Sequence, residues 1–175
     1  MKLLFLFLII FISNISIALE QSDKIFPDSY LGKYRGDLLI NSGKDHQKVQ
    51  MEFHLLETDS LGKYDYTIIY GSDKNRQTRR YTLIEKIKST GNYILDENNG
   101  ILLEAKVLFD KMFFIFEINS SLLTAYISFG DDHLIFEVVA AQTESKLVSG
   151  GLSDEIPEVF SYPVGVVQSA ILFKE

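Results

Sequence analysis

Hydrophobic and polar residues alternate along much of this chain with a period of two, which is the spacing of half-buried β-strands. The clearest case is the segment 49–55, where every second residue from Val49 to Leu55 is apolar. The same alternation returns in the segment 64–70, with tyrosines at three of the four positions on one face. Both segments therefore predict antiparallel strands with one face on a core.

A denser apolar region follows between residues 101 and 140. It contains four apolar segments, 101–107, 112–118, 122–129 and 133–140, separated by short polar gaps. The gaps hold Asp110-Lys111, Asn119-Ser120-Ser121 and Gly130-Asp131-Asp132, which are residues that favour tight turns. This arrangement predicts a β-meander.

Four further segments, 34–40, 79–85, 93–96 and 164–174, also have strand character, which brings the total to about ten. The fold class we predict is all-β, an antiparallel up-and-down meander of about 8–10 strands closed into a barrel, since closure removes exposed sheet edges. A β-sandwich is the alternative.

The strand pattern lapses over residues 142–163, while the meander is apolar on both faces. An apolar outer face is unfavourable in water unless another segment or another chain packs on it. We expect either that the segment 142–163 folds back over this outer face, or that two copies form a homodimer there, around Phe113 and Ile115.

The amino-terminus has the features of a secretory signal. Lys2 precedes a run without charge from Leu3 to Ile12, and Ser16-Ile17-Ala18 supplies small residues before a cleavage point after Ala18. Polar residues interrupt the run too early for a membrane span. We expect residues 1–18 to be a signal peptide and residues 19–175 to form a single domain without a membrane span. The mature protein is expected to be periplasmic or extracellular.

Charge and composition narrow the partners. The formal net charge of −7 at pH 7 falls to −8 once Lys2 is removed with the signal, which argues against binding to nucleic acid. The chain contains no Cys, so it has neither disulfides nor a lipid-attachment cysteine.

The sequence shows no catalytic or metal-binding motif. The three histidines, His46, His54 and His133, are far apart and lack the ligand spacing of a zinc site. Gly150-Gly151-Leu152-Ser153 does not have the order of a nucleophile elbow. We therefore favour a non-catalytic protein and expect neither a cofactor nor a metal.

Arg79 is the most informative candidate for a binding residue. In a strand whose Tyr81 faces inward, the alternation turns Arg79 inward too, toward Tyr64 and Tyr66. An isolated charge in an apolar interior is costly, and Glu85 is the one acidic residue that the alternation places inward nearby. Alternatively, Arg79 lies at the open end of its strand and reaches solvent.

This pattern suggests a ligand with a carboxylate. The carboxylate would pair with Arg79, and Phe114 and Phe116 of the meander would contact an apolar tail. We expect a barrel that binds a small apolar or amphipathic molecule. The alternative is a packed barrel that serves as a protein-interaction or structural module of the cell envelope, and the volume of the interior distinguishes the two.

The signal, the Gly32-x-Tyr34 strand and the long meander resemble the calycin barrels, the group of lipocalins and fatty-acid-binding proteins. Lipocalins carry Gly-x-Trp where this chain has Gly32-x-Tyr34. The segments Tyr66-Thr67-Ile68-Ile69-Tyr70-Gly71, Asp96-Glu97-Asn98-Asn99-Gly100 and Glu155-Ile156-Pro157-Glu158-Val159 are similar to small exported Bacteroidetes proteins of unassigned function. The resemblance implies an exported barrel with a ligand-binding interior.

Overall fold

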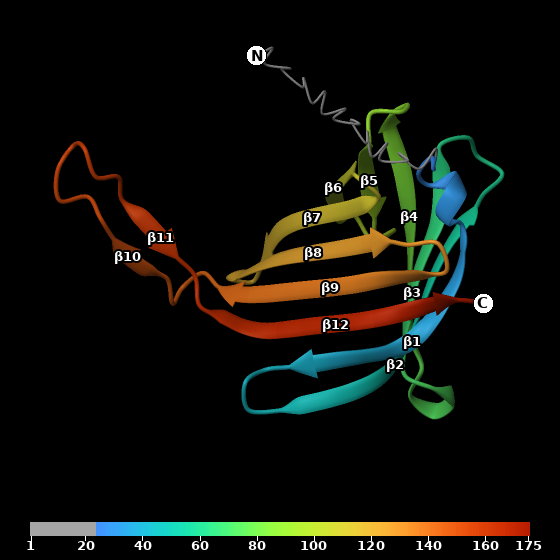
Figure 1. Ribbon diagram of the computed structural model, residues 1–175, viewed down its shortest axis with the longest axis horizontal. Helices are drawn as coiled ribbons and strands as arrows, with labels where there is room; N and C mark the ends of the chain where they lie inside the picture. Colours follow the sequence, from blue (N-terminus) through green and yellow to red (C-terminus); the bar gives the residue numbers. More distant parts are fainter. Residues whose placement is uncertain (1–23) are drawn as a thin grey trace, which may run out of the picture.

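A computed structural model describes residues 24–175 of the chain, and the expected signal peptide lies outside this range. Ten antiparallel strands form a closed barrel (Figure 1). They are β1 (Gly32–Asn41), β2 (His46–Glu57), β3 (Lys63–Tyr70), β4 (Gln77–Ile87), β5 (Asn92–Asp96), β6 (Leu102–Leu108), β7 (Lys111–Ile118), β8 (Ser121–Phe129), β9 (His133–Gln142) and β12 (Val164–Lys174). Two short 3₁₀ turns, η1 (Asp28–Tyr30) and η2 (Asp73–Asn75), lie outside the barrel sheet.

The strands follow one another around the barrel in sequence order, apart from its closure. There, β12 pairs with β9 on one side and with β1 on the other, so the last strand seals the sheet against the first. The predicted all-β, up-and-down barrel is confirmed, and the β-sandwich alternative is not adopted. Gly36 allows the closure, because a β-carbon at this position would overlap the carbonyl oxygen of Ile171 on β12.

The barrel is filled at one end by aromatic side chains. Phe53 is fully buried, its ring lies edge-on to that of Tyr66 at 4.8 Å, and Tyr30 stacks obliquely on Phe129 at 5.0 Å. The Tyr34 hydroxyl donates a 2.6 Å hydrogen bond to the carbonyl oxygen of Tyr30, which fastens η1 across this end. We call it the closed end, and the opposite end, where β1 joins β2 and β3 joins β4, the mouth.

The sheet opens toward the mouth. The ladder between β6 and β7 joins only Ala105–Leu108 to Lys111–Phe114, so the rest of β7, from Ile115 onward, pairs only with β8 among the described strands. In Figure 1 the group formed by β7, β8, β9 and β12 runs across the direction of β4. The barrel sheet is therefore interrupted between β6 and β7 at its mouth end.

The segment 142–163 does not fold back over the meander, so that expectation is wrong. Its strands β10 (Leu147–Ser149) and β11 (Val159–Ser161) pair with each other and form a hairpin that projects from the barrel (Figure 1). We call residues 142–163 the arm. Its root is fixed to the β7–β8 turn, where the Thr143 amide donates to the Ser120 carbonyl at 2.9 Å.

The outer face that the arm was expected to cover is consequently exposed in part. Ile115 has 68% of its surface accessible. Phe113 is half-buried, packed edge-on against Tyr126 at 5.5 Å and flanked by the Lys111 ammonium. Contact between two copies at this face remains a prediction.

Candidate functional site: a polar mouth above an apolar interior

Two adjoining cavities occupy the mouth half of the barrel. The inner one has a volume of about 180 Å³ and the outer one about 760 Å³. They share Tyr70, Arg79 and Gln168 in their walls. We call these three residues the neck, since they stand where the two cavities meet.

The inner cavity is mainly apolar. Its wall comes from inward positions of β3 through β9 and from Gln168 of β12. Its apolar lining residues are Ile68, Leu95, Leu103, Phe114, Phe116, Leu123, Ala125, Phe136 and Val138. Glu97, next to the end of β5, is the one acidic residue among the described residues that line it. The inner cavity can thus hold the apolar part of a ligand.

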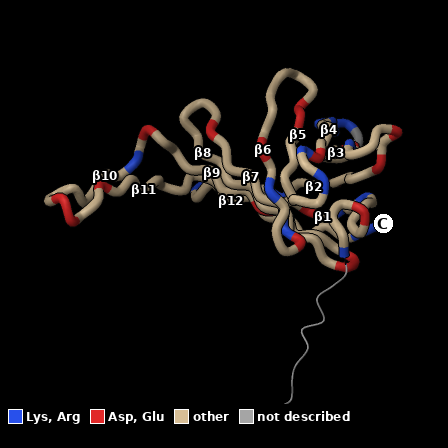
Figure 2. The backbone as a smooth tube through the Cα atoms, turned by 90° about the horizontal axis from the view of Figure 1, so that it is seen from above, with Lys and Arg blue, Asp and Glu red and all other residues tan. Residues whose placement is uncertain are grey.

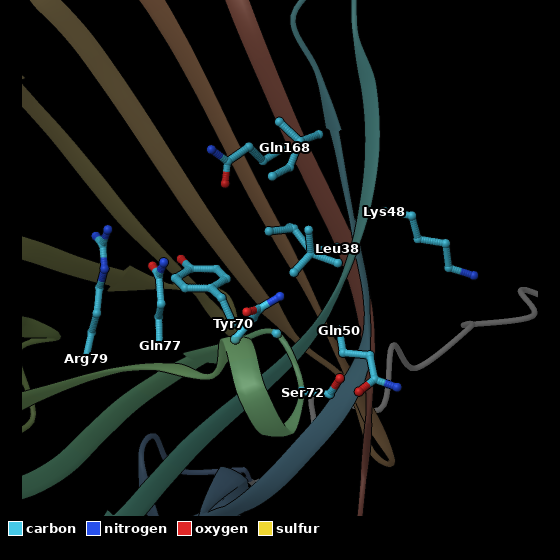
Figure 3. A pocket seen from close by; sticks show the side chains of 12 residues that line it. Leu38, Lys48, Gln50, Tyr70, Ser72, Gln77, Arg79 and Gln168 are labelled. Carbon is cyan, nitrogen blue, oxygen red and sulfur yellow. The ribbon is translucent and has the colours of Figure 1, made fainter.

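The outer cavity has a mixed lining, in which Leu38, Ile40 and Val49 lie beside several polar side chains. Gln77 and Gln168 face each other across it with Tyr70 and Arg79 beside them, from β3, β4 and β12 (Figure 3). Lys48 lines its rim but points away in Figure 3 and pairs with Asp37 at 2.8 Å. Amides, a phenol and a guanidinium therefore surround the entrance to the apolar interior, where they can hydrogen-bond a polar or anionic group.

Arg79 turns inward as the alternation predicted, but it lies at the mouth end of β4 and is exposed. Its guanidinium lies 5.7 Å from the centre of the Tyr70 ring. Partial burial lowers the pKa of the guanidinium. A hydrogen bond donated to Tyr81 and the proximity of Tyr70 and Glu97 raise this pKa by more, so that it ends above its ordinary value. Arg79 is thus a permanently charged group held by two aromatic side chains.

The exposure of Arg79 changes the argument for a ligand. The geometry matches the alternative in which the guanidinium reaches solvent. Because the charge is solvated, it does not require an anionic ligand as a partner. The neighbouring carboxylate is Glu97, whereas Glu85 accepts a 2.8 Å bond from the Ser89 amide near the closed end. Arg79 can still bind an anion, but with the strength of a solvated ion pair.

The tyrosines expected at the site separate into two groups. Tyr66 and Tyr81 lie in the wall of the inner cavity with ring centres 6.0 Å apart, and burial raises the pKa of both hydroxyls. Tyr64 lies nearer the closed end, where burial and the carboxylates of Asp28 and Glu85 raise its pKa. The structure therefore brings together Arg79, Tyr66, Tyr81, Phe114 and Phe116, and leaves Tyr64 outside.

Sequence reasoning did not select the two glutamines of the mouth. Gln168 occupies an inward position between Val166 and Ala170 on β12, and Gln77 starts the inward row of β4. A polar residue in an otherwise apolar inward row was the available signal for Gln168. Gln77 gave no such signal, because it precedes the recognisable strand pattern.

Metal-ligand clusters and membrane-spanning helices are both absent from residues 24–175. No group of three or more His, Asp or Glu side chains in this range is arranged to hold a metal ion. No helix within it has the length and apolar character that crossing a membrane requires. A search of protein-family models gave no match to this chain, and neither did a search of curated proteins.

Proposed function

We propose that this protein is an exported, non-catalytic, calycin-like barrel that binds a small amphipathic molecule. One observation supports this most: a mouth that carries Gln77, Gln168 and Arg79 opens directly onto a mainly apolar inner cavity. Small-molecule sites commonly combine an apolar cavity with a few oriented polar groups. The ligand's polar or anionic group would lie among Gln77, Gln168 and Arg79, and its apolar group would lie against Phe114 and Phe116.

The volumes limit the size of the ligand. Typical small-molecule sites measure roughly 300–1,000 Å³, and the inner cavity of about 180 Å³ is smaller. The apolar group that fits is therefore short or compact, and a long acyl chain would have to extend through the mouth.

A cavity-filling substitution tests the proposal. Ala125 faces the inner cavity from β8, and Thr124 beside it faces outward. Titration of the protein with a fluorescent medium-chain fatty acid should show saturable binding, which Ala125→Leu should weaken at least tenfold and Thr124→Leu should leave unchanged. Absence of saturable binding by the parent, or equal binding by Ala125→Leu, would reject the proposal.

The packed closed end supports a second candidate, a protein-interaction module of the cell envelope. The aromatic cluster around Phe53 and Tyr34 fills the closed end, and the arm exposes apolar residues. In this case the parent would bind no amphipathic probe, and the arm would be the first surface to test.

A further inference from the structure

The arm exposes an unusual amount of apolar surface for so small an element. A two-stranded hairpin is marginally stable in water unless it packs against something else. At least 45% of the surface of each of these side chains is accessible: Leu147, Val148, Leu152, Ile156, Val159 and Phe160. Such clustered exposure marks a contact surface.

The tip of the arm is acidic. Residues 151–158 contain Asp154, Glu155 and Glu158 and no basic residue. A tight turn, in which the Ile156 amide donates to the Ser153 carbonyl at 3.0 Å, places Asp154 and Glu155 at the end of the arm. Figure 2 shows this acidic tip at one extremity of the molecule.

Basic residues that complement the acidic tip lie elsewhere on the same chain. The segment 74–80 contains Lys74, Arg76, Arg79 and Arg80 and no acidic residue. Arg76 pairs with Glu52 at 3.2 Å and Arg79 with Tyr81, while Lys74 and Arg80 are exposed. We call this segment the basic rim, since it runs along the mouth into β4.

The basic rim also offers backbone groups. The β4–β5 ladder begins at Thr82, so the part of β4 before it pairs only with β3 among the described strands. On this side the Asn98 side-chain amide donates to the Arg80 carbonyl at 3.2 Å. The rest of this short edge can accept an extended segment from another chain.

The tip and the basic rim of one chain cannot meet. In Figure 2 the arm projects to one side of the barrel and β4 lies at the other. An anionic lipid surface would repel a tip with three acidic residues. A second copy of the chain, however, presents the matching basic rim, and a two-fold arrangement lets both arms make the same contact.

We propose that the arm binds the basic rim of a second copy, so that two chains form a reciprocal dimer through the acidic tip and Lys74 and Arg80. This dimer does not depend on the proposed ligand. It differs from a dimer through the outer face around Phe113 and Ile115, because its contacts are charged at the tip. It should therefore weaken as salt approaches roughly 1 M, where the Debye length is about 3 Å.

A charge exchange tests the dimer. The variants are Asp154→Lys with Glu155→Lys in the tip, and Lys74→Glu with Arg80→Glu in the basic rim. Each variant alone brings like charges together and should be monomeric in sedimentation-velocity ultracentrifugation, with the dimer dissociation constant raised at least tenfold relative to the parent. An equimolar mixture of the two variants restores both contacts and should form dimers.

A matched control changes the charge by the same amount as the tip variant, but at another place on the surface. Asp59→Lys with Asp65→Lys alters two exposed acidic residues near the closed end and should leave the parent dimer intact. All four positions of the test variants are exposed as well, so circular dichroism should show folded protein throughout. A parent that is monomeric at high concentration and low salt, or a mixture that remains monomeric, would overturn the proposal. A dimer that survives both exchanges would overturn it too and direct attention to the outer face.

Discussion

The Arg79 guanidinium lies 5.7 Å from the centre of the Tyr70 ring, at the neck between the outer and the inner cavity. Tyr70 is largely buried, and burial raises the pKa of its hydroxyl even though Arg79 lowers it. The ring thus stays neutral at physiological pH and holds the cation on one side of the entrance. Under the proposed function, this pair would keep the polar end of an amphipathic ligand at the entrance.

Replacing Arg79 should weaken binding of an anionic probe. Since the guanidinium is exposed, we expect Arg79→Ala to cost about 1 kcal/mol, or roughly fivefold in affinity, as for a solvated ion pair. Arg80→Ala is the matched control, because its side chain points outward from the same strand. Isothermal titration calorimetry with octanoate measures the affinities of the parent, Arg79→Ala and Arg80→Ala. Equal affinities for parent and Arg79→Ala would remove Arg79 from the site.

The closed end should carry much of the stability. Phe53 is fully buried, so Phe53→Ala should lower the free energy of unfolding by about 3–5 kcal/mol, the range for large-to-small changes in a core. Leu39→Ala, at an exposed outward position on β1, should change it by less than about 0.5 kcal/mol. Urea denaturation gives both values. A small effect of Phe53→Ala would show that the aromatic cluster is loosely packed.

Glu52 should make stability depend on pH in the acid range. Burial alone would raise the pKa of its carboxyl, but hydrogen bonds and charge from Arg35, Arg76 and His54 outweigh this and lower it. Its contribution is therefore complete above the unfolded pKa near 4.5 and is lost as the pH falls through the lower folded value. Glu52→Gln should flatten the fall in melting temperature below about pH 4.5. An unchanged slope would contradict this account.

The strand pattern could be read from the sequence because each barrel strand has one face on a common interior. The alternation at 49–55 and 64–70 follows directly from this, and β2 and β3 match it except that Ile69 is buried as well. The arm could not be predicted in the same way. Its strands are three residues each and exposed on both faces, so they leave no alternation, and their direction depends on contacts at Ser120 that are distant in sequence.

The candidate site could be predicted only in part from the sequence. Alternation fixes which way Arg79 points, but not how far along the barrel axis it lies, and that position decides between burial and solvent. The same limit explains why Tyr64 was grouped with Tyr66: they share a face of β3, yet one lies toward the closed end and the other beside the inner cavity.

Export remains a prediction that mass spectrometry can check. Expressed in a bacterium with a competent secretion system, the protein should lose residues 1–18 and appear in the periplasmic or extracellular fraction. The intact mass of the purified protein identifies the cleavage point. Recovery of the uncut chain from the membrane fraction would contradict the expectation.

The central claim is that the mouth and inner cavity form one binding site for a small amphipathic molecule, and amide NMR spectra recorded during a titration with octanoate test it most directly. The account predicts saturable shifts of the side-chain amides of Gln77 and Gln168 and of the backbone amides of Phe114 and Phe116. Signals from the closed end around Tyr34 and from the arm should stay in place. Saturating octanoate that shifts none of the four mouth and cavity signals, or shifts only those of the outer face, would contradict it.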